Sequence, residues 1–278
     1  MIGEDNSTDG TREICKKYAE ENPDKIRLFL RRPEDKIEVQ GKKTWHYNYV
    51  ANIVMARGKY IALCDGDDFW TDQNKLQKQY DLMESDDQIM LSHHAYSRLY
   101  PDGSIKKNPV PVEKYSSTED IIRSFKMRTC TTMYRNIFED HPLPGWFYDS
   151  LLGDIILCLH LSRFGKTYGM PDNMAVYRTN ATESIIKSMA DAQKANTEII
   201  YNSLLNDEDF KPQHELIKHK LLKIKKKMLY QYAKEGKLPL ALNELSIHVA
   251  NMKQLNAYSL KEHIKIFLKM IRSQLAGS

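Results

Sequence analysis

Residues 59–70 read Lys59-Tyr60-Ile61-Ala62-Leu63-Cys64-Asp65-Gly66-Asp67-Asp68-Phe69-Trp70, and this stretch decides the fold. Its first half, Tyr60 to Cys64, is a short apolar run rich in strand-forming residues, which predicts a buried β-strand. Aspartate and glycine are poor strand formers, so we expect the strand to end at Asp65. In an open α/β sheet, ligands bind in the crevice beyond the carboxyl ends of the strands. The acidic half of the stretch therefore marks a candidate binding site.

The carboxylates at the end of this strand have the chemistry of a divalent metal site. Asp65 and Asp67 flank Gly66, which lets backbone or ligand approach closely because it has no side chain. Two carboxylates, with water or phosphate completing the coordination shell, suit Mg²⁺ or Mn²⁺. The structural alternative is a polar turn after a core strand, with Asp68 capping the next helix. The acidic residues alone do not decide between the two interpretations.

Helices and strands alternate on both sides of this stretch. Upstream, the residue patterns predict a helix over 11–21, a strand over 26–30, a polar loop over 31–44 and a helix over 46–57. Downstream, they predict helices over 74–83, 118–125 and 149–164 and strands over 89–99, 129–134, 166–168 and 174–177. This alternation predicts an α/β fold whose mostly parallel sheet is flanked by helices.

Composition indicates an ordinary globular chain. It has 278 residues, of which 41% are apolar and 28% charged. No apolar run approaches the ~20 residues that span a bilayer, and the polar, acidic first 25 residues predict no signal peptide. The four cysteines are widely spaced and form no CxxC pair, which predicts reduced thiols and a cytoplasmic location. They are Cys15, Cys64, Cys130 and Cys158.

The chain changes character near residue 185, beyond which its pattern is helical. Residues 211–278 hold 14 Lys and Arg against 4 Asp and Glu, a balance of +10, whereas the whole chain carries only +4. We therefore expect two domains, residues 1–184 and a basic helical region over 185–278. The amphipathic helices expected in this basic region, over 214–230 and 260–275, have two possible roles. They either touch an anionic membrane surface or pack their apolar faces on the first domain or on a second subunit.

Several motifs resemble those of inverting glycosyltransferases of family 2, which have the Rossmann-related GT-A fold. The resemblance covers about residues 1–180, so it implies that residues 1–184 form a GT-A-like domain that binds a nucleotide-sugar. The matching stretches are Glu4-Asp5-Asn6-Ser7-Thr8-Asp9-Gly10-Thr11, Ala56-Arg57-Gly58-Lys59-Tyr60-Ile61 leading into Asp65-Gly66-Asp67-Asp68-Phe69-Trp70, Pro144-Gly145-Trp146, Gly153-Asp154 and Val176-Tyr177-Arg178.

The resemblance implies a role for each matching residue. Asp5 would contact the base of the nucleotide-sugar. Asp65 and Asp67 match the DxD motif, which holds Mn²⁺ or Mg²⁺ on the donor diphosphate, and Asp65 also meets the ribose. Asp154 matches the general base, for which the structural alternative is an acid at a helix N-terminus. Arg178 matches a residue beside the donor phosphates, for which the alternative is a surface ion pair.

The reaction implied by the resemblance is transfer of a sugar, with inversion, from a nucleoside-diphosphate-sugar to a hydroxyl group. A UDP-sugar is the expected donor and a glycan or lipid-linked molecule the acceptor, in surface polysaccharide or glycan assembly. A divalent cation and an arginine would offset the charge of the leaving nucleoside diphosphate, and a carboxylate would take the acceptor's proton. We expect a cytoplasmic enzyme that either acts free or lies at the inner face of the membrane, as a monomer or a homodimer. The lysine cluster has no aromatic platform, so no nucleic-acid partner is expected.

Two features depart from the family pattern. The sequence begins just before the acidic loop, whereas the family usually starts with a strand and a helix, so we expect an N-terminally truncated domain with unpaired strand edges. Asn180 stands where many relatives have a histidine after Tyr-Arg. These departures keep one alternative open: a non-catalytic interaction module or inactive fragment of such an enzyme. A phosphoryl-transfer enzyme of the haloacid dehalogenase type fits poorly. The motif of that type has Thr or Val soon after the second aspartate, whereas Asp67 is followed by Asp68-Phe69-Trp70.

Overall fold

The structure is a computed structural model that describes residues 1–39, 42–44, 46–108, 115–148, 150, 153–179 and 190–237. The chain divides into two compact units, Met1–Asn196 and Thr197–Ser278. The boundary expected near residue 185 falls at residues 180–189, which lie outside the described residues, and it stays a prediction.

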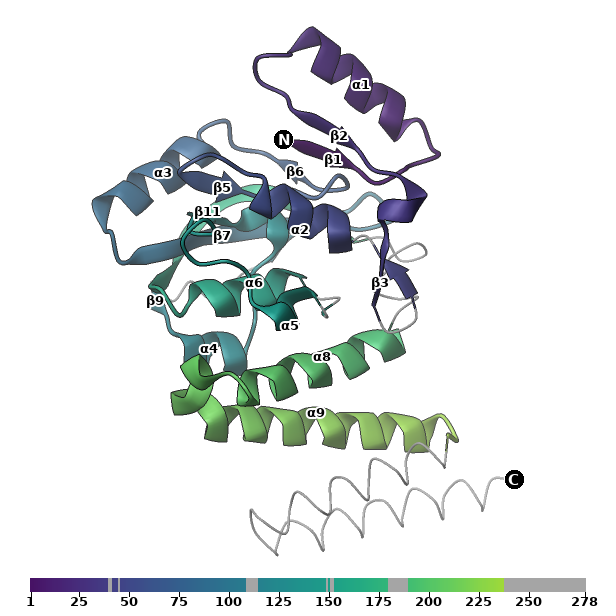
Figure 1. Ribbon diagram of the computed structural model, residues 1–278, viewed down its shortest axis with the longest axis vertical. Coiled ribbons are helices and arrows are strands. Elements are labelled where there is room, and N and C mark those ends of the chain that lie inside the picture. Colours follow the sequence, from purple (N-terminus) through teal and green to yellow (C-terminus); the bar gives the residue numbers. More distant parts are fainter. Residues whose placement is uncertain are drawn as a thin grey trace, which may run out of the picture. The chain divides into compact units, whose positions relative to one another are not determined.

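A seven-stranded sheet forms the centre of the first unit (Figure 1). The long strands β7 and β11 pair in parallel, and β5 runs in the same direction as β7 because both are antiparallel to β10. The carboxyl ends of β5, β7 and β11 therefore meet at one edge of the sheet. The strand order is β5 (Tyr60–Ala62), β10 (Met133–Arg135), β7 (Ile89–Leu99), β11 (Lys166–Arg178) and β6 (Phe69–Trp70), with β8 (Ile105–Asn108) on β7 and β9 (Tyr115–Ser116) on β11.

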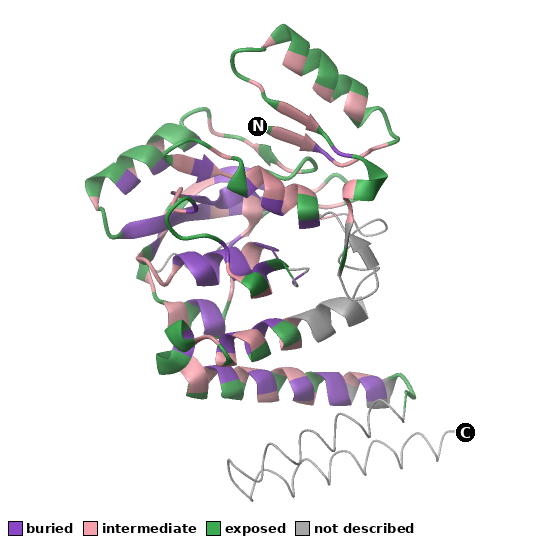
Figure 2. Ribbon diagram, in the orientation of Figure 1, coloured by how far each residue is buried: buried purple, intermediate pink, exposed green. Residues whose placement is uncertain are grey.

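Helices flank this sheet, which confirms the predicted α/β class. One buried cluster joins Met83 of a helix to Ile89 and Met133 of two strands. Figure 2 shows the central strands and α6 largely buried, as expected for elements covered on both sides. The helices are α2 (His46–Val54), α3 (Lys75–Ser85), α4 (Thr118–Arg123), α5 (Gly145–Tyr148) and α6 (Gly153–Leu161), together with the short 3₁₀ turn η2 (Thr129–Thr131).

The two longest strands, β7 and β11, differ in how well the sequence predicts their bounds. The residue pattern at 89–99 predicts β7 with its observed bounds, Ile89–Leu99. The two short strands expected over 166–168 and 174–177 are instead one strand, β11. The pairing shifts register between Met170 and Ala175, so the polar residues there form an irregularity inside the strand. A bulge of this kind looks like a loop in the sequence.

A second, two-stranded parallel sheet lies at the start of the chain. It consists of β1 (Ile2–Glu4) and β2 (Leu28–Leu30), with α1 (Thr11–Glu21) between them. Arg31 joins this sheet to α2, because its Nε donates to Asn48 Oδ1 at 3.0 Å and its Nη2 to Asn52 Oδ1 at 3.1 Å. Asn48 Nδ2 in turn donates to the Gly3 carbonyl at 2.8 Å.

Helix α1 has its predicted bounds, but its apolar face is not buried. The helical spacing of Ile14, Cys15, Tyr18 and Ala19 puts them on one face, yet α1 has no buried residue. Ile14 is 59% exposed and Tyr18 55% exposed. In the described part of the chain, β1 pairs with β2 alone and joins no larger sheet. This small sheet offers too little surface to cover the helix (Figure 2).

The segment expected to be a loop over 31–44 contains regular structure. It holds the 3₁₀ turn η1 (Pro33–Asp35) and an antiparallel hairpin of β3 (Ile37–Val39) and β4 (Lys42–Thr44). The segment is rich in charged residues, which are poor strand formers. The composition of the segment therefore predicts a loop, and the hairpin was not predicted.

The second unit is helical where it is described. It contains the end of α8 (Ala190–Leu205), η3 (Glu208–Gln213) and α9 (His214–Lys234). Ile217, Leu221 and Met228 of α9 are buried, as their spacing predicts. The helix expected over 260–275 lies outside the described residues.

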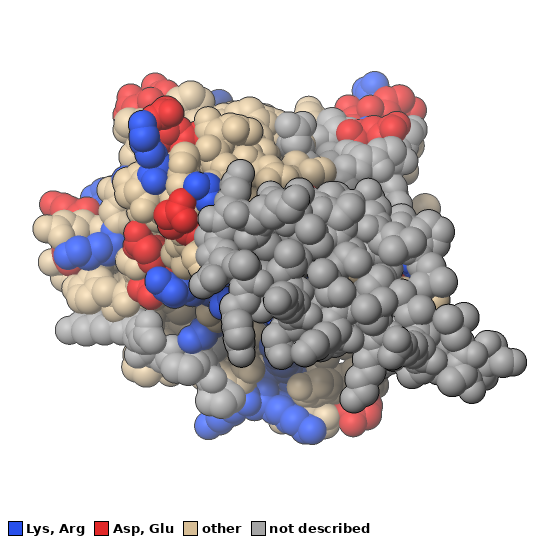
Figure 3. All heavy atoms as spheres, turned by 90° about the horizontal axis from the view of Figure 1, so that it is seen from below, with Lys and Arg blue, Asp and Glu red and all other residues tan. Residues whose placement is uncertain are grey.

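The lysines of α9 are not all free to meet an external partner. Lys225 is buried and pairs with Glu198 of α8 at 2.5 Å, and Lys218 pairs with Glu215 at 2.7 Å. Acidic and basic side chains both occur on the described part of the face in Figure 3. Among the described helices, none is long and apolar enough to cross a membrane.

Candidate functional site

The acidic loop, Leu63 to Asp68, connects β5 to β6 at the edge of the sheet. Its turn is closed by a hydrogen bond from Asp68 N to Asp65 O at 3.1 Å. After the loop, β6 pairs with β11 and sets Phe69 opposite Val176. The acidic loop therefore lies directly beside the carboxyl end of β11, where the sequence places Arg178.

Arg178 is bound to the acidic loop at two points. Its backbone N–H donates to Asp68 Oδ1 at 2.9 Å, and its Nε donates to the Asp67 carbonyl at 3.0 Å. The guanidinium thus contacts a carbonyl and not a carboxylate, which differs from the surface ion pair weighed as its alternative. The side chain is exposed, so its remaining N–H groups face solvent where a phosphate could bind.

The carboxylates of the acidic loop repel one another. Burial raises the pKa of Asp65 to about 7, and the neighbouring charges of Asp68 and Asp67 add to the rise. Part of the Asp65 surface stays open to solvent. Burial also raises the pKa of Asp68, against the opposing hydrogen bond from Arg178 N–H. A bound cation would relieve this repulsion.

The acidic loop fits a hard divalent cation that shares its shell with a ligand. Among the described residues, no group of three or more His, Cys, Asp or Glu side chains is placed to hold a metal ion. Asp65 and Asp67 are both exposed and offer carboxylate oxygens. Mg²⁺ typically uses one or two carboxylates with waters and substrate phosphates. The residues therefore suit a metal held jointly by the protein and a phosphate ligand.

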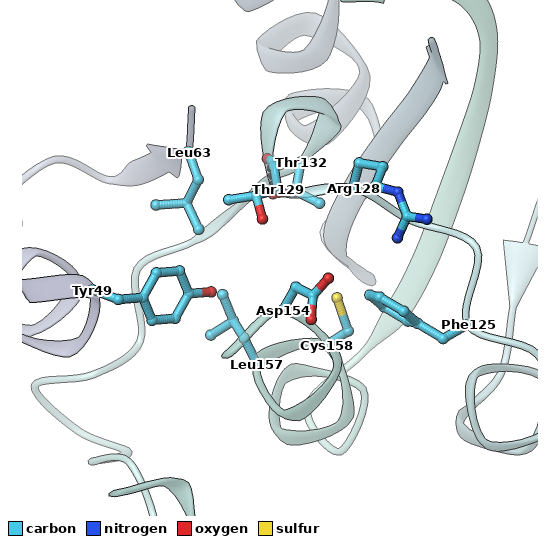
Figure 4. A pocket seen from close by; sticks show the side chains of 9 residues that line it. All are labelled: Tyr49, Leu63, Phe125, Arg128, Thr129, Thr132, Asp154, Leu157 and Cys158. Atoms are coloured by element: carbon cyan, nitrogen blue, oxygen red, sulfur yellow. Dashed lines mark hydrogen bonds between the residues drawn. The ribbon is translucent and has the colours of Figure 1, made fainter. Parts of the chain in front are cut away.

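Asp154 lies in the first turn of α6 and lines a small cavity (Figure 4). Its Oδ1 accepts from Ile155 N–H at 2.8 Å. Burial raises the pKa of Asp154, while that hydrogen bond and the charge of Arg128 oppose the rise. The charge of Asp154 in turn helps to raise the pKa of Asp65, and Leu63 of the acidic loop lines the same cavity as Asp154. The cavity is lined by Tyr49, Leu63, Phe125, Arg128, Thr129, Thr132, Asp154, Leu157 and Cys158.

Arg128 is the site residue that the sequence analysis missed. Its guanidinium lies over the ring of Tyr177, with 5.1 Å between its Cζ and the ring centroid. Its Nε is buried and has no hydrogen-bond partner among the described residues. In Figure 4, Arg128 and Asp154 enter the same cavity from different elements. No motif marks this arginine, because only the folded chain brings it to Asp154.

Asp5 is bound by residues outside the acidic loop. It follows β1, and its carboxylate is 3.5 Å from Lys36 Nζ. Burial raises the pKa of Asp5, and the Lys36 charge opposes the rise. The preceding Glu4 is buried and bonded to Arg12 and to Ser7 N–H. Within the described part of the chain, no hydrogen bond or ion pair links Asp5 to the acidic loop.

The structure thus brings together four of the predicted site residues, Asp65, Asp67, Asp154 and Arg178, and adds Asp68, which binds the Arg178 backbone. It does not join Asp5 to them. Asn180, the second departure from the family pattern, lies outside the described residues. The roles that the resemblance implies for these residues stay predictions.

Gly153 is required by the packing of the cavity, and its replacement is a test of the site's geometry. A Cβ at residue 153 would lie 2.5 Å from Tyr49 Cε1, inside the ring's contact surface. We expect Gly153→Ala to lower the free energy of unfolding by about 1–3 kcal/mol, because the buried ring or the start of α6 must move. Urea unfolding measures the change.

Gly145→Ala is the matched control for this replacement. Gly145 begins α5, and a Cβ there would meet nothing within 4 Å. We expect its unfolding midpoint to stay close to that of the native chain. An equal loss in both variants would contradict the packing argument for Gly153.

Comparison with known proteins gives a match to a family and to solved structures. The family model "Glycosyl transferase family 2" matches residues 1–141. Two curated relatives, the uncharacterized proteins Rv1520 of Mycobacterium tuberculosis and Mb1547 of Mycobacterium bovis, are each 28% identical over 183 residues, which is 65% of this chain and 50% of theirs. The chain therefore spans half the length of these relatives.

Two solved structures share the fold. The crystal structure of Staphylococcus aureus TarS residues 1–349 superposes with a TM-score of 0.61 and 14% identity, covering 100% of this chain and 82% of that one. The mannosyltransferase PcManGT of Pyrobaculum calidifontis, solved with GDP-Man and Mn²⁺, gives a TM-score of 0.50 and 15% identity over 98% and 76% of the two chains. At these identities the likeness establishes the fold alone.

Proposed function

The chain belongs to glycosyl transferase family 2, and from this we propose that it transfers a sugar, with inversion, from a nucleoside-diphosphate-sugar to an acceptor hydroxyl group. One observation carries the proposal. The acidic loop, Arg178 and Asp154 converge where β5 and β11 end. This edge of an α/β sheet is where ligands bind. This convergence supports a single site that would hold both the diphosphate and the acceptor's proton.

The donor end of the site is the acidic loop. Asp65 and Asp67 would hold Mn²⁺ or Mg²⁺, which when bound offsets the charge of the leaving nucleoside diphosphate. The mannosyltransferase solved with GDP-Man and Mn²⁺ supports a nucleotide-sugar and a divalent cation, and the sequence interpretation favours a UDP-sugar. Arg178 would donate to a phosphate oxygen from its exposed N–H groups. Asp5 would contact the base.

The acceptor end of the site is the cavity at Asp154. Its carboxylate would take the proton of the acceptor hydroxyl as that oxygen attacks the anomeric carbon. The new glycosidic bond forms as the sugar–phosphate bond breaks on the opposite face, and the electron pair leaves with the nucleoside diphosphate. A single displacement of this kind inverts the anomeric configuration. Leu157 and Cys158 line the same cavity, and burial there raises the pKa of Asp154, which makes it a stronger base.

The biological setting of this reaction is the finer part of the proposal. A glycan or lipid-linked acceptor in surface polysaccharide assembly fits the family, and exposed lysines of α9 such as Lys223 and Lys227 offer charge for contact with an anionic membrane. Alternatively, the C-terminal helices would pack against a second copy of the chain in a homodimer.

A second candidate is a non-catalytic module that binds a nucleotide or a partner. The observation that favours it is the separate β1–β2 sheet, which holds Asp5 without a described contact to the acidic loop. A nucleotide pocket divided in this way would bind its ligand weakly.

Removal of the metal tests the proposed function. We expect the purified chain to release nucleoside diphosphate from one member of a panel of UDP-, GDP- and TDP-sugars with Mn²⁺, and to lose this turnover in EDTA because the leaving charge is no longer offset. Added Mn²⁺ should restore it. Metal-dependent binding of UDP by calorimetry without turnover of any sugar would favour the binding module. The absence of both would contradict the proposal.

A further inference from the structure

A row of basic side chains runs across the sheet towards the cavity. Arg98 of β7 pairs in register with Lys106 of β8 on one side and with Tyr177 of β11 on the other. Residues paired in register project from the same face of a sheet. Lys106, Arg98 and Tyr177 therefore lie side by side on one face, with Lys107 on the other face opposite Ser97.

Tyrosine rings connect this row to Arg128. The Cζ of Arg98 lies 5.9 Å from the centroid of the Tyr96 ring, and its Nη2 donates to Tyr96 Oη at 3.3 Å. The Tyr96 and Tyr177 rings meet edge to face, with 6.2 Å between centroids. Arg128 lies over the other ring, 5.1 Å from the Tyr177 centroid. We call Lys106, Arg98 and Arg128 the basic row. It leads from an exposed hairpin to the cavity that holds Asp154.

The cations of the basic row have no carboxylate partner in the described part of the chain. By contrast, Arg12, Lys36 and Lys78 each form an ion pair there. The nearest negative charges act on the row at longer range: Asp102 on Lys106, and Asp154 and Asp68 on Arg128.

The arginines of the basic row also hold unused donors. The Nε atoms of Arg98 and Arg128 are buried and make no hydrogen bond to any described residue. A buried donor without a partner is costly, and in native proteins such a group commonly marks a functional site or a bound ligand. Guanidinium groups bind phosphate oxygens through paired N–H donors. The positive charge and the guanidinium donors of the row thus suit an anionic ligand.

We propose that the basic row binds a phosphate group of the acceptor and guides its hydroxyl to Asp154. This inference rests on the proposed function, which makes Asp154 the base for the acceptor. Under the proposed function the donor diphosphate is already assigned to the acidic loop and Arg178, so the row, which reaches the Asp154 cavity through Arg128, is assigned to the acceptor. The acceptor is therefore a phosphate ester, in a soluble molecule or as a lipid headgroup.

Calorimetry with glycerol 1-phosphate tests the basic row in the full chain. EDTA is present, so that no metal bridges phosphate to the acidic loop, and glycerol is the uncharged comparison. We expect the native chain to bind glycerol 1-phosphate and not glycerol. Replacing both Arg98 and Lys106 with methionine should weaken binding ~10-fold or more, because two charge-assisted contacts are lost. Lys106→Met alone, at an exposed position, should weaken binding several-fold and keeps the test valid if the double variant does not fold.

Lys107→Met is the matched control, since it removes the same charge one residue away on the opposite face. It should bind glycerol 1-phosphate like the native chain. An equal loss in Lys107→Met, or no loss in the Arg98 and Lys106 variants, would overturn the inference. Vesicles of phosphatidylglycerol, compared with phosphatidylcholine, separate the two sources of phosphate: row-dependent binding to the anionic vesicles alone assigns a lipid headgroup. Binding to neither probe overturns the inference.

The proposed function is tested separately, by measuring donor hydrolysis by the native chain and by Lys107→Met. Row-dependent phosphate binding without hydrolysis of any donor would leave the phosphate site in place and remove the transferase. Hydrolysis without phosphate binding would do the reverse.

Discussion

Asp154→Asn is expected to lower the rate of sugar transfer by ~10²–10⁴-fold, the usual contribution of a general base. The amide is nearly isosteric but takes no proton from the acceptor. Donor affinity should stay within about twofold, because the acidic loop and Arg178 are untouched. Single-turnover kinetics with saturating donor, beside calorimetry with UDP and Mn²⁺, separates the two effects.

The pH dependence of the native enzyme also tests whether Asp154 is the general base. Burial raises the pKa of Asp154 above the ordinary aspartate value of 3.8. Because the base must be ionised, the rate should fall as pH falls through this raised pKa, at a higher pH than an exposed aspartate would give. At saturating Mn²⁺, which keeps Asp65 in its metal-bound carboxylate form, the residual rate of Asp154→Asn should lack this acidic limb.

The control for this prediction is Glu215→Gln, which removes an exposed acid from the first turn of α9. If Asp154 served only the helix dipole, both variants would change stability by about 0.3–1 kcal/mol and leave the rate alone. An Asp154→Asn enzyme with native turnover and a native pH profile would contradict the assignment of the base.

Asp67→Asn is expected to lower kcat/KM by at least ~10²-fold at fixed Mn²⁺, since a metal ion supplies several kcal/mol of charge stabilisation. A neutral amide is a poorer ligand than a carboxylate for a hard cation. Higher Mn²⁺ concentration should recover part of the rate. A Mn²⁺ titration of donor hydrolysis measures both effects.

Asp65 gives this prediction a second readout. Its pKa, raised to about 7 by burial and by Asp68 and Asp67, means that it is largely protonated at pH 6 and ionised at pH 8. Only the carboxylate binds the cation, so Mn²⁺ should bind more tightly at pH 8 than at pH 6. Asp81→Asn, an exposed carboxylate on α3, is the control and should titrate like the native chain. Equal metal affinity in Asp67→Asn and the native chain would remove the acidic loop as the metal site.

The sequence was most informative where local pattern decides the structure. The strand β7 and the helix over 11–21 have their predicted bounds. The pattern did not say what would cover Ile14 and Tyr18, because helical spacing reports a face and not its partner. The irregular part of β11 was hidden for a related reason: its pairing with β7, and not its own residues, keeps the strand continuous.

The residues of the candidate site also differ in whether local sequence or the folded chain brings them together. Asp65, Asp67 and Asp68 are adjacent in the chain and follow a recognisable strand, so the sequence alone predicts an acidic site there. Arg178 and Asp154 were placed by family resemblance, and their contacts depend on the pairing of β6 with β11 and on the packing of α6. Arg128 and the basic row could not be predicted, since they depend on the register of strands far apart in the chain.

The acidic loop is six residues long and is anchored at both ends, by β5 on β10 and by β6 on β11. A free segment would lose about 1–2 kcal/mol of conformational entropy per residue when its carboxylates gather round a cation. Folding of the sheet has already removed most of this freedom. If the loop binds a metal as proposed, the free energy of coordination would therefore appear as affinity for that metal and its diphosphate ligand, and would not be spent on ordering the loop.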